Sequence, residues 1–368
     1  MSPLAVNNEQ GAWKMEGDVV RIGLLGCGTI SQFAHIPALT RAQGIQFAAI
    51  CDGGSDLLET IGARAGVSNL FTDYREFLEK GGIDAVLIAA PDEFHLPLAR
   101  QALEAGKHVL VEKPLAVDSN ACMQLLQVVE QSGRKLQVGC MKRHDPGIAF
   151  AQTFVKERLG EIISASGWYR DSLFRYEMQT AILPRPVTSP RSIRPAADPK
   201  TSDRRHYSLV THGAHLFDTL RFLAGDVSSV NAALAEKCNQ YSWHGLLHFE
   251  SGALGHFELS VKTSGDYAEG YLVHGEHGSV EIQTFLPFYY RPSKVRAFDG
   301  RTQQWHTPLG ANSNPYKNQI EAFARAILED RPTNPDAADG WAAVSLLEGV
   351  EESVNRGARV TVEGPVRT

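Results

Sequence analysis

The chain has 368 residues, 43% of them hydrophobic and 21% charged, which is enough for two domains and a sizeable core in a protein of ordinary globular composition. Its formal net charge of −6 argues against a nucleic-acid or an anionic-membrane partner. Five widely spaced cysteines match neither a disulfide framework nor a zinc site, so we expect a reducing, cytoplasmic compartment.

The first 18 residues carry Glu9, Glu16 and Asp18 and lack the apolar segment of a secretory signal, so we interpret them as an N-terminal extension. In the sequence as a whole, no apolar stretch approaches the ~20 residues that a membrane span needs.

The first clear element is an apolar run that is typical of a buried strand and ends at Gly26. Gly26 and Gly28 permit a tight turn and close approach of the backbone to a ligand. A helix is expected to begin at Thr29 and Ile30, where its free N–H groups would face a pyrophosphate. Ser31 takes the place of the third small residue of the dinucleotide-binding pattern, and most glycine turns of this kind, taken alone, bind nothing.

A second apolar run, residues 45–50, leads to Asp52. A carboxylate at the end of this second strand can accept hydrogen bonds from a ribose diol and would repel a 2′-phosphate. The next residues, 53–55, offer no arginine to hold such a phosphate, which favours NAD over NADP. Alternatively, Asp52 only caps the helix expected over residues 55–65.

Strand-like and helix-like runs alternate from Val19 to Cys140, which predicts a doubly wound parallel sheet with ligands at the carboxyl ends of its strands. Further strands are expected over 84–90, 108–112 and 135–140, and further helices over 73–78, 93–105 and 118–132. Gly26, Asp52, Pro91 and Lys113 fall at strand ends, so one crevice can collect them. We place this cofactor domain at residues 19–142.

The pattern changes in residues 143–368, which we interpret as a second, α+β domain. The segment 171–205 has no clear periodicity, which is typical of a functional lid or a disordered loop. Runs of period two predict a mostly antiparallel sheet, with a hairpin turn at 250–252. These runs cover 161–170, 227–235, 243–249, 254–261, 267–274, 278–284 and 295–298, and helices are expected over 146–159, 207–223, 316–328 and 336–356.

Two side chains are suited to acid–base chemistry. Lys113 follows a buried strand that Pro114 ends, so it would point into the crevice partly desolvated. Alternatively, it is a surface lysine paired with a carboxylate. His215 lies on one face of the helix 207–223 together with Thr211, and a histidine there can take a hydroxyl proton near neutral pH. His215 could instead be a satisfied, half-buried histidine.

A metal site on the same helix would have to use His212, His215 and Asp218. Their spacing matches no established site, so we expect no metal.

Several stretches together resemble the Gfo/Idh/MocA (glucose–fructose oxidoreductase/inositol dehydrogenase) family. They are Gly26–Ile30, Asp52, Ala90–His95, Ala105–Pro114 and Gly213–Asp218. The stretch Ala105–Pro114 is highly specific to that family. The resemblance implies an N-terminal Rossmann domain joined to a C-terminal α+β domain with an open-faced, mostly antiparallel sheet. It also implies a homodimer or homotetramer built through that sheet.

The resemblance further implies roles for individual residues. Lys113 would contact substrate and the nicotinamide ribose, and His215 would work beside it in proton transfer. The cofactor would be lined by Ala90, Pro91, His95 and Glu112, and Arg143 would bind it from the domain junction.

Many family members carry Asp four residues before the catalytic histidine, where this chain has Thr211. A threonine can orient a hydroxyl or a water but cannot hold a negative charge. Either Lys113 carries more of the proton transfer, or a carboxylate such as Asp171 supplies the charge.

These observations predict an NAD-dependent dehydrogenase that oxidises a secondary hydroxyl of a sugar, sugar derivative or cyclitol. Side chains suited to the other hydroxyls are Arg170, Asp171, Arg175, His206, Tyr207 and His212. One alternative is an NAD-dependent glycosidase that oxidises and re-reduces a sugar during bond cleavage. Another is a non-catalytic regulator that senses the dinucleotide, against which the presence of Lys113 and His215 speaks.

Overall fold

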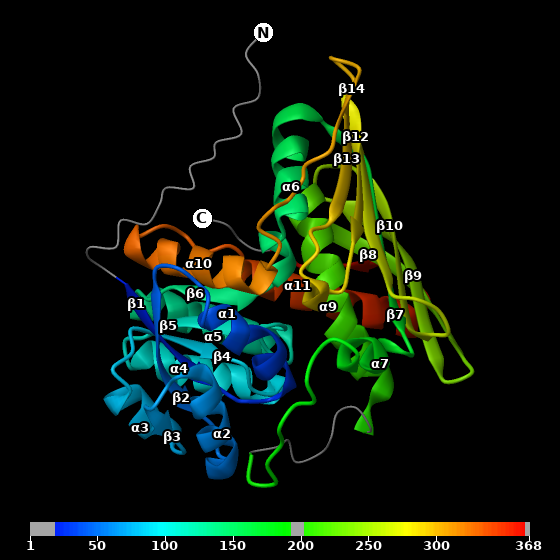
Figure 1. Ribbon diagram of the computed structural model, residues 1–368. Helices are drawn as coiled ribbons and strands as arrows, with labels where there is room; N and C mark the ends of the chain where they lie inside the picture. Colours follow the sequence, from blue (N-terminus) through cyan, green and yellow to red (C-terminus); the bar gives the residue numbers. More distant parts are fainter. Residues whose placement is uncertain (1–18, 193–201, 365–368) are drawn as a thin grey trace.

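The expected parallel sheet forms the first of two domains that lie side by side in the computed structural model, which describes residues 19–192 and 202–364 (Figure 1). The proposed extension, residues 1–18, lies outside the described residues. Six strands are in parallel register, in the order β3-β2-β1-β4-β5-β6. They are β1 (Val20–Leu25), β2 (Ile45–Cys51), β3 (Leu70–Phe71), β4 (Ala85–Ile88), β5 (His108–Glu112) and β6 (Leu136–Gly139).

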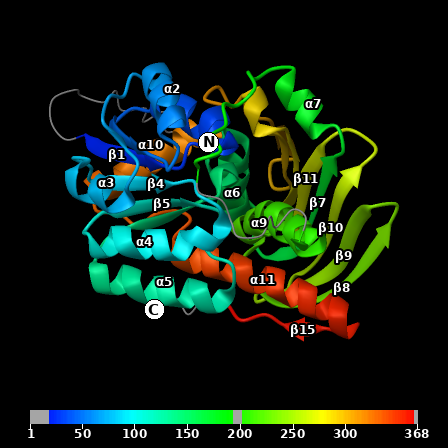
Figure 2. The same cartoon turned by 90° about the horizontal axis from the view of Figure 1, so that it is seen from below.

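Helices cover both faces of this sheet, as its almost wholly apolar central strands require (Figure 2). They are the π-helical turn η1 (Ser31–His35), α1 (Ile36–Leu39), α2 (Ser55–Ala65), α3 (Tyr74–Lys80), α4 (His95–Glu104) and α5 (Ser119–Ser132), with the 3₁₀ turns η2 (Asp92–Phe94) and η3 (Met141–His144). The strand order reverses between β1 and β4, which is the place where open α/β sheets bind ligands. The predicted Rossmann fold is confirmed.

The second domain is built on nine described strands in the order β14-β13-β12-β11-β7-β10-β9-β8-β15. All neighbours are antiparallel except β7 and β10, so the predicted mostly antiparallel sheet is confirmed. The strands are β7 (Ile162–Ser172), β8 (Val227–Lys237), β9 (Gln240–Phe249), β10 (Leu254–Thr263), β11 (Ala268–Gly275), β12 (Gly278–Thr284), β13 (Lys294–Asp299), β14 (Gln304–His306) and β15 (Val360–Thr361).

One face of this sheet packs against helices and the other stays open (Figure 2). The helices of the domain are α6 (Pro146–Arg158), α7 (Arg175–Thr180), α9 (Arg204–Ala224), α10 (Pro315–Leu328) and α11 (Ala337–Arg356), with the 3₁₀ turn η4 (Pro287–Tyr289). Leu246 and Leu254 remain more than half exposed on the open face, at 55% and 54%. None of the described helices is both long enough and apolar enough to cross a membrane.

Two features of this fold differ from what periodicity indicates. Helix α7 lies inside the segment that shows no periodicity, because six residues are too few to establish a helical pattern. The C-terminal helices return to the first domain: Tyr316 and Phe323 of α10 pack with β1, and Trp341 of α11 packs with the residues around α5.

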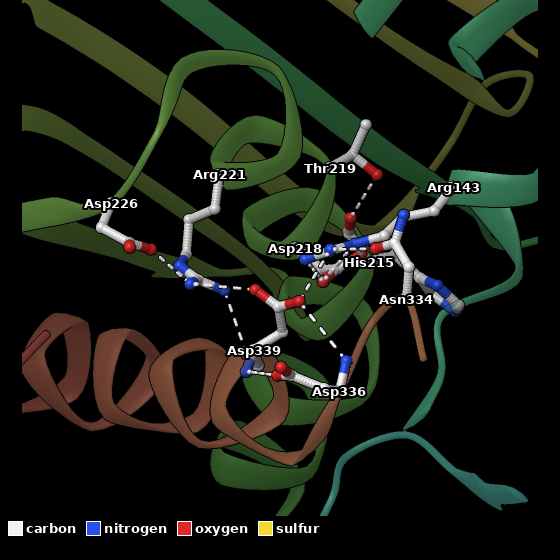
Figure 3. A network of polar contacts seen from close by, with 9 residues as sticks. All are labelled: Arg143, His215, Asp218, Thr219, Arg221, Asp226, Asn334, Asp336 and Asp339. Atoms are coloured by element: carbon white, nitrogen blue, oxygen red, sulfur yellow. Dashed lines mark hydrogen bonds and ion pairs between the residues drawn. The ribbon is translucent and has the colours of Figure 1, made fainter. Parts of the chain in front are cut away.

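A buried ionic network joins the two domains at Arg143 (Figure 3). Its guanidinium donates to both carboxylate oxygens of Asp218 on α9, at 2.7–3.1 Å, and to Oδ2 of Asp339 on α11, at 3.0 Å. It also donates to Asn334 Oδ1 at 2.8 Å. The side chains of Arg143 and Asp218 are 4% and 2% exposed, so the charges compensate one another away from solvent.

We predict that Arg143→Met lowers the free energy of unfolding by about 3–5 kcal/mol, because it leaves the buried carboxylate of Asp218 without its cation, whereas Asp339 keeps Arg221. Urea or thermal unfolding measures the change. The matched control is Arg356→Met, which removes an exposed i,i+4 ion pair with Glu352 and should leave stability close to that of the wild type. Equal effects of the two substitutions would contradict a structural role for the network.

Candidate active site

A cavity of about 290 Å³ lies between the carboxyl edge of the parallel sheet and helix α9. The first domain contributes Thr29, Ile30, Phe33, Ala90, Asp92, Glu112, Lys113, Met141 and Lys142 to its wall. The second contributes Tyr169, Arg175, Tyr176, Gln179, Tyr207, Thr211, His212, His215, Tyr267, Leu286, Pro287, Phe288 and Tyr316. The cavity therefore combines the start of the glycine-loop helix with the two groups expected to perform acid–base chemistry.

The glycine loop has the geometry that a dinucleotide requires. Gly26 has a φ of +93°, and a Cβ atom there would lie 2.5 Å from the carbonyl oxygen of Ala89, so only glycine fits. At Gly28 a Cβ atom would meet no described atom within 4 Å, which leaves open space for close approach of a ligand. Ser31 donates from its hydroxyl to the Gly26 carbonyl at 2.6 Å, so the unusual third residue of the pattern fastens the loop.

Asp52 lies at the expected strand end, and its carboxylate already accepts three hydrogen bonds. Oδ2 accepts from the Cys27 N–H at 2.8 Å. Oδ1 accepts from the Gly54 N–H at 2.9 Å and from the Ser192 hydroxyl at 2.8 Å. Part of the carboxylate thus organises the turn before α2, and a ribose diol would have to share it with, or displace, Ser192.

Ser192 belongs to a segment of the second domain that crosses the first, which we term the strap (residues 183–192). Val187 exchanges two hydrogen bonds with the Gln32 side chain, at 2.8 and 2.9 Å. Ser189 donates to Asp56 at 2.6 Å, and Arg191 donates to Ser55 at 3.1 Å. This part of the long segment is therefore anchored beside Asp52.

Lys113 and His215 lie on the wall of the same cavity. Lys113 Nζ donates to the backbone carbonyl of Thr211 at 3.3 Å, which brings the end of β5 against α9. His215 lies one turn further along α9, and its ring is parallel to that of Tyr169, with centroids 6.3 Å apart.

Two buried histidines support the turn that carries Lys113. His35 Nε2 lies 2.7 Å from Glu112 Oε1, and Glu112 Oε2 accepts from the Lys113 N–H at 3.1 Å. Burial alone would raise the pKa of Glu112, but the hydrogen bond from His35 and nearby positive charge lower it overall. His95 contacts the carbonyls of Pro114 and Ala90, at 2.7 and 3.0 Å, so it ties two strand-end loops together.

The carboxylate of Asp171 lies near His212 rather than near His215. Its Oδ2 is 3.7 Å from His212 Nε2, and its Oδ1 is 3.2 Å from Nη1 of Arg175. Burial raises the pKa of Asp171, and the charge of Arg175 opposes that rise. The other ring nitrogen of His212 contacts the Tyr169 hydroxyl at 3.4 Å.

Lys142 is a cavity residue that sequence reasoning missed. Its ammonium forms a buried ion pair with Glu269 and lies 4.9 Å from the centre of the Tyr169 ring. Burial lowers the pKa of Lys142, although Glu269 opposes the change. Its position just after β6 is the same signal that identified Lys113 after β5. Tyr169 and Tyr267 were missed because their place depends on strand pairing in the second sheet.

Burial and nearby cations shape the protonation of both cavity histidines. The pKa of His215 is well below its ordinary value because the ring is desolvated and because Lys113 and Lys142 lie close. The pKa of His212 is lowered by burial and by the charges of Arg175 and Lys113. Both rings are therefore neutral near pH 7.

The structure does not bring every expected residue to this cavity. Arg170 forms an exposed ion pair with Glu258, and His206 contacts Glu351 at 3.1 Å. Arg143 is held in the domain junction. Gly26, Gly28, Asp52, Pro91 and His95 lie at the same edge of the sheet but outside the cavity wall.

Comparisons with known proteins agree with this architecture. The model of an oxidoreductase family's NAD-binding Rossmann fold matches residues 20–140, and the model of its C-terminal α/β domain matches residues 199–362. Inositol 2-dehydrogenases of Rubrobacter xylanophilus and Saccharopolyspora erythraea are 26% and 27% identical to the chain over 364 and 361 residues. These alignments cover 95% and 94% of this chain and 95% and 96% of the relatives.

A solved NAD-binding oxidoreductase from Klebsiella pneumoniae has the same fold, with a TM-score of 0.80. The two chains are 21% identical, and the match covers 94% of this chain and 99% of the other.

The two loop glycines give a paired prediction. Gly28→Ala should leave thermal stability unchanged but weaken NADH binding by roughly tenfold or more, because its methyl group occupies the space left for the ligand. Gly26→Ala should lower the free energy of unfolding by about 1–3 kcal/mol, because the positive φ at position 26 and the nearby carbonyl oxygen of Ala89 both disfavour a side chain there. Fluorescence titration of NADH and thermal unfolding measure the two effects. Tight NADH binding by Gly28→Ala would contradict the placement of the cofactor.

Proposed function

The chain belongs to the Gfo/Idh/MocA oxidoreductase family, and we propose that it is an NAD-dependent dehydrogenase acting on a secondary hydroxyl of a sugar, sugar derivative or cyclitol. The observation that carries the proposal is the meeting of Lys113 and His215 on one cavity wall at the carboxyl edge of the parallel sheet. The inositol 2-dehydrogenases that resemble the chain over almost its whole length support this substrate class.

The residues near the ribose end support NAD as the cofactor. Asp52 and Asp56 bring two carboxylates to the place where NADP carries its 2′-phosphate, and Arg191 brings one guanidinium. The balance of charge therefore disfavours a phosphate there. Gly26, Gly28, Thr29 and Ile30 would cradle the pyrophosphate, and Ala90 and Glu112 would lie along the nicotinamide half.

In the proposed reaction the substrate carbon loses hydride and its hydroxyl loses a proton. NAD, when bound, supplies the hydride acceptor. The neutral His215 takes the hydroxyl proton, and Lys113 donates a hydrogen bond to the same oxygen and stabilises the charge that develops on it. Thr211 and Tyr207 line the cavity where they can orient neighbouring hydroxyls. Asp171 lies beside His212 and not beside His215, so we assign to Lys113 the larger share of the role that a carboxylate at position 211 would have.

We also propose that the open face of the nine-stranded sheet is covered by a second copy of the chain. Leu246, Leu254 and Trp305 are exposed on this face, where apolar side chains would otherwise contact water.

The reaction is tested by mixing the protein, NAD and a panel of sugars and inositols and following the absorbance of reduced nicotinamide. On an accepted substrate, Lys113→Met and His215→Gln should each lower kcat/KM by roughly 10²–10⁴-fold, because each removes a group that acts on the reacting oxygen. NADH binding should change little in His215→Gln, whereas Lys113→Met also removes the contact expected with the nicotinamide ribose. His206→Gln is the control, since His206 contacts Glu351 outside the cavity. Wild-type turnover by Lys113→Met would refute the mechanism, and hydrolysis without NADH formation would indicate the glycosidase alternative.

The lowered pKa of His215 predicts the pH dependence of alcohol oxidation. His215 can act as a base only while its ring is neutral, and its pKa in the folded protein is depressed. As the pH is lowered, kcat/KM should therefore stay constant through pH 7 and fall only below the ordinary histidine pKa of about 6.5. The residual activity of His215→Gln should lack this acidic limb. An acidic limb centred above pH 7 in the wild type would contradict a neutral, desolvated base.

A further inference from the structure

A second cavity of about 320 Å³ adjoins the one that holds Lys113 and His215. We term these the outer and the inner cavity. Arg175, Tyr176, Tyr207 and His212 line both, so these four side chains form a shared wall. The inner cavity must also admit the nicotinamide end of the cofactor, since Thr29, Ile30 and Glu112 belong to it. Each cavity alone is near the lower limit of ligand pockets, about 300 Å³, whereas the two combined are well within their range.

One buried polar atom of the shared wall lacks a partner among the described residues. Arg175 Nε has no hydrogen-bond acceptor among the residues that the structure describes, whereas Nη1 of the same guanidinium is paired with Asp171 Oδ1 at 3.2 Å. An unpaired buried donor is costly, so a ligand that offers an oxygen atom to Arg175 Nε would be favoured. Because Arg175 lines both cavities, this argues for a ligand that places an oxygen atom at the boundary between them.

The outer cavity has the character of a carbohydrate site. Tyr176 and Tyr207 present aromatic rings, and Leu173 and Val261 present apolar surface, which suits the C–H face of a pyranose. Arg204 and Lys262 also line the outer cavity, and neither forms an ion pair with a described residue. Their N–H groups can therefore donate hydrogen bonds to the ring and hydroxyl oxygens of a sugar.

We propose that the outer cavity is a second sugar subsite and that the chain oxidises one ring of a disaccharide or a comparable glycoside. The oxidised ring lies in the inner cavity beside His215, and the second ring lies in the outer cavity against Tyr207 and Val261. The inference rests on the proposed function, which it makes more specific by naming a two-ring substrate.

The test compares one-ring with two-ring sugars in the NAD-linked assay. Maltose, cellobiose and trehalose are measured beside glucose and methyl glucoside, and at least one two-ring sugar should have a kcat/KM roughly tenfold higher or more. The double variant Arg204→Ala/Lys262→Gly should remove most of this advantage through KM, with kcat and one-ring turnover within about twofold of the wild type. Glycine suits position 262 because Lys262 has a φ of +63°.

The matched control is Arg205→Ala. Arg205 neighbours Arg204 on α9 but contacts Asn355, outside both cavities, so this variant should behave as the wild type. The second subsite would be overturned if one-ring sugars were turned over as well as two-ring sugars. It would also be overturned if the double variant affected both classes of sugar alike.

Calorimetric titration of the two-ring sugars into the NADH-loaded protein separates this inference from the proposed function. Binding that the double variant weakens, without NADH formation from any sugar, would support the subsite and refute the dehydrogenase. NADH formation from one-ring sugars together with undetectable binding of every two-ring sugar would support the dehydrogenase and refute the subsite.

Discussion

The structure depends on the ion pairs that Arg143 makes between two domains. Arg143 directly follows the parallel sheet and forms an ion pair with Asp218 (Figure 3). Asp218 lies three residues beyond His215 on α9. The same guanidinium holds Asp339 on α11, so both helices are fixed relative to the strand ends. Because Lys113 is carried by the sheet and His215 by α9, their meeting in one cavity follows from this network rather than from either domain alone.

Charge in the cavity is arranged so that one cation remains available. Lys142 is paired with Glu269, and Arg175 with Asp171. Of the described cavity lysines and arginines, Lys113 is the one whose ammonium contacts a backbone carbonyl instead of a carboxylate. Its positive charge also helps to keep the neighbouring histidines neutral. A hydrogen-bond donor and a neutral base at one place are what the oxidation of an alcohol requires.

Much of the cofactor-binding part of the site could be predicted from the sequence, because it depends on short sequence patterns. Parallel strands end at one edge of a sheet, so Gly26, Asp52 and Lys113 could be placed together from their positions after apolar runs. The same rule applied to β6 would have found Lys142. Helix α5 and the β9–β10 hairpin could also be predicted, because helical spacing of apolar residues and the 250–252 turn are local signals.

The substrate side depends on long-range pairing that no short pattern encodes. Tyr169 and Tyr267 meet because β7 and β11 are neighbours in the second sheet, although they are far apart in the sequence. The strap reaches Asp52 from the other domain through Ser192, which is 140 residues away. Arg170 does not reach the cavity, contrary to the expectation from the sequence, because neighbouring residues of a strand point to opposite faces of the sheet. Tyr169 is buried on the face that packs against helices, so Arg170 lies on the exposed face.

The central claim is that, in this cavity, one secondary alcohol of the substrate loses a hydride from carbon to NAD and a proton from its hydroxyl to His215. Incubating the protein with NAD and uniformly carbon-deuterated sugars and inositols, followed by mass spectrometry of the reduced nicotinamide, tests it most directly. The account predicts one deuterium in each molecule of NADH formed, together with a ketone product, and loss of this transfer in His215→Gln. Reduced cofactor without deuterium, or undiminished transfer after His215→Gln, would contradict it.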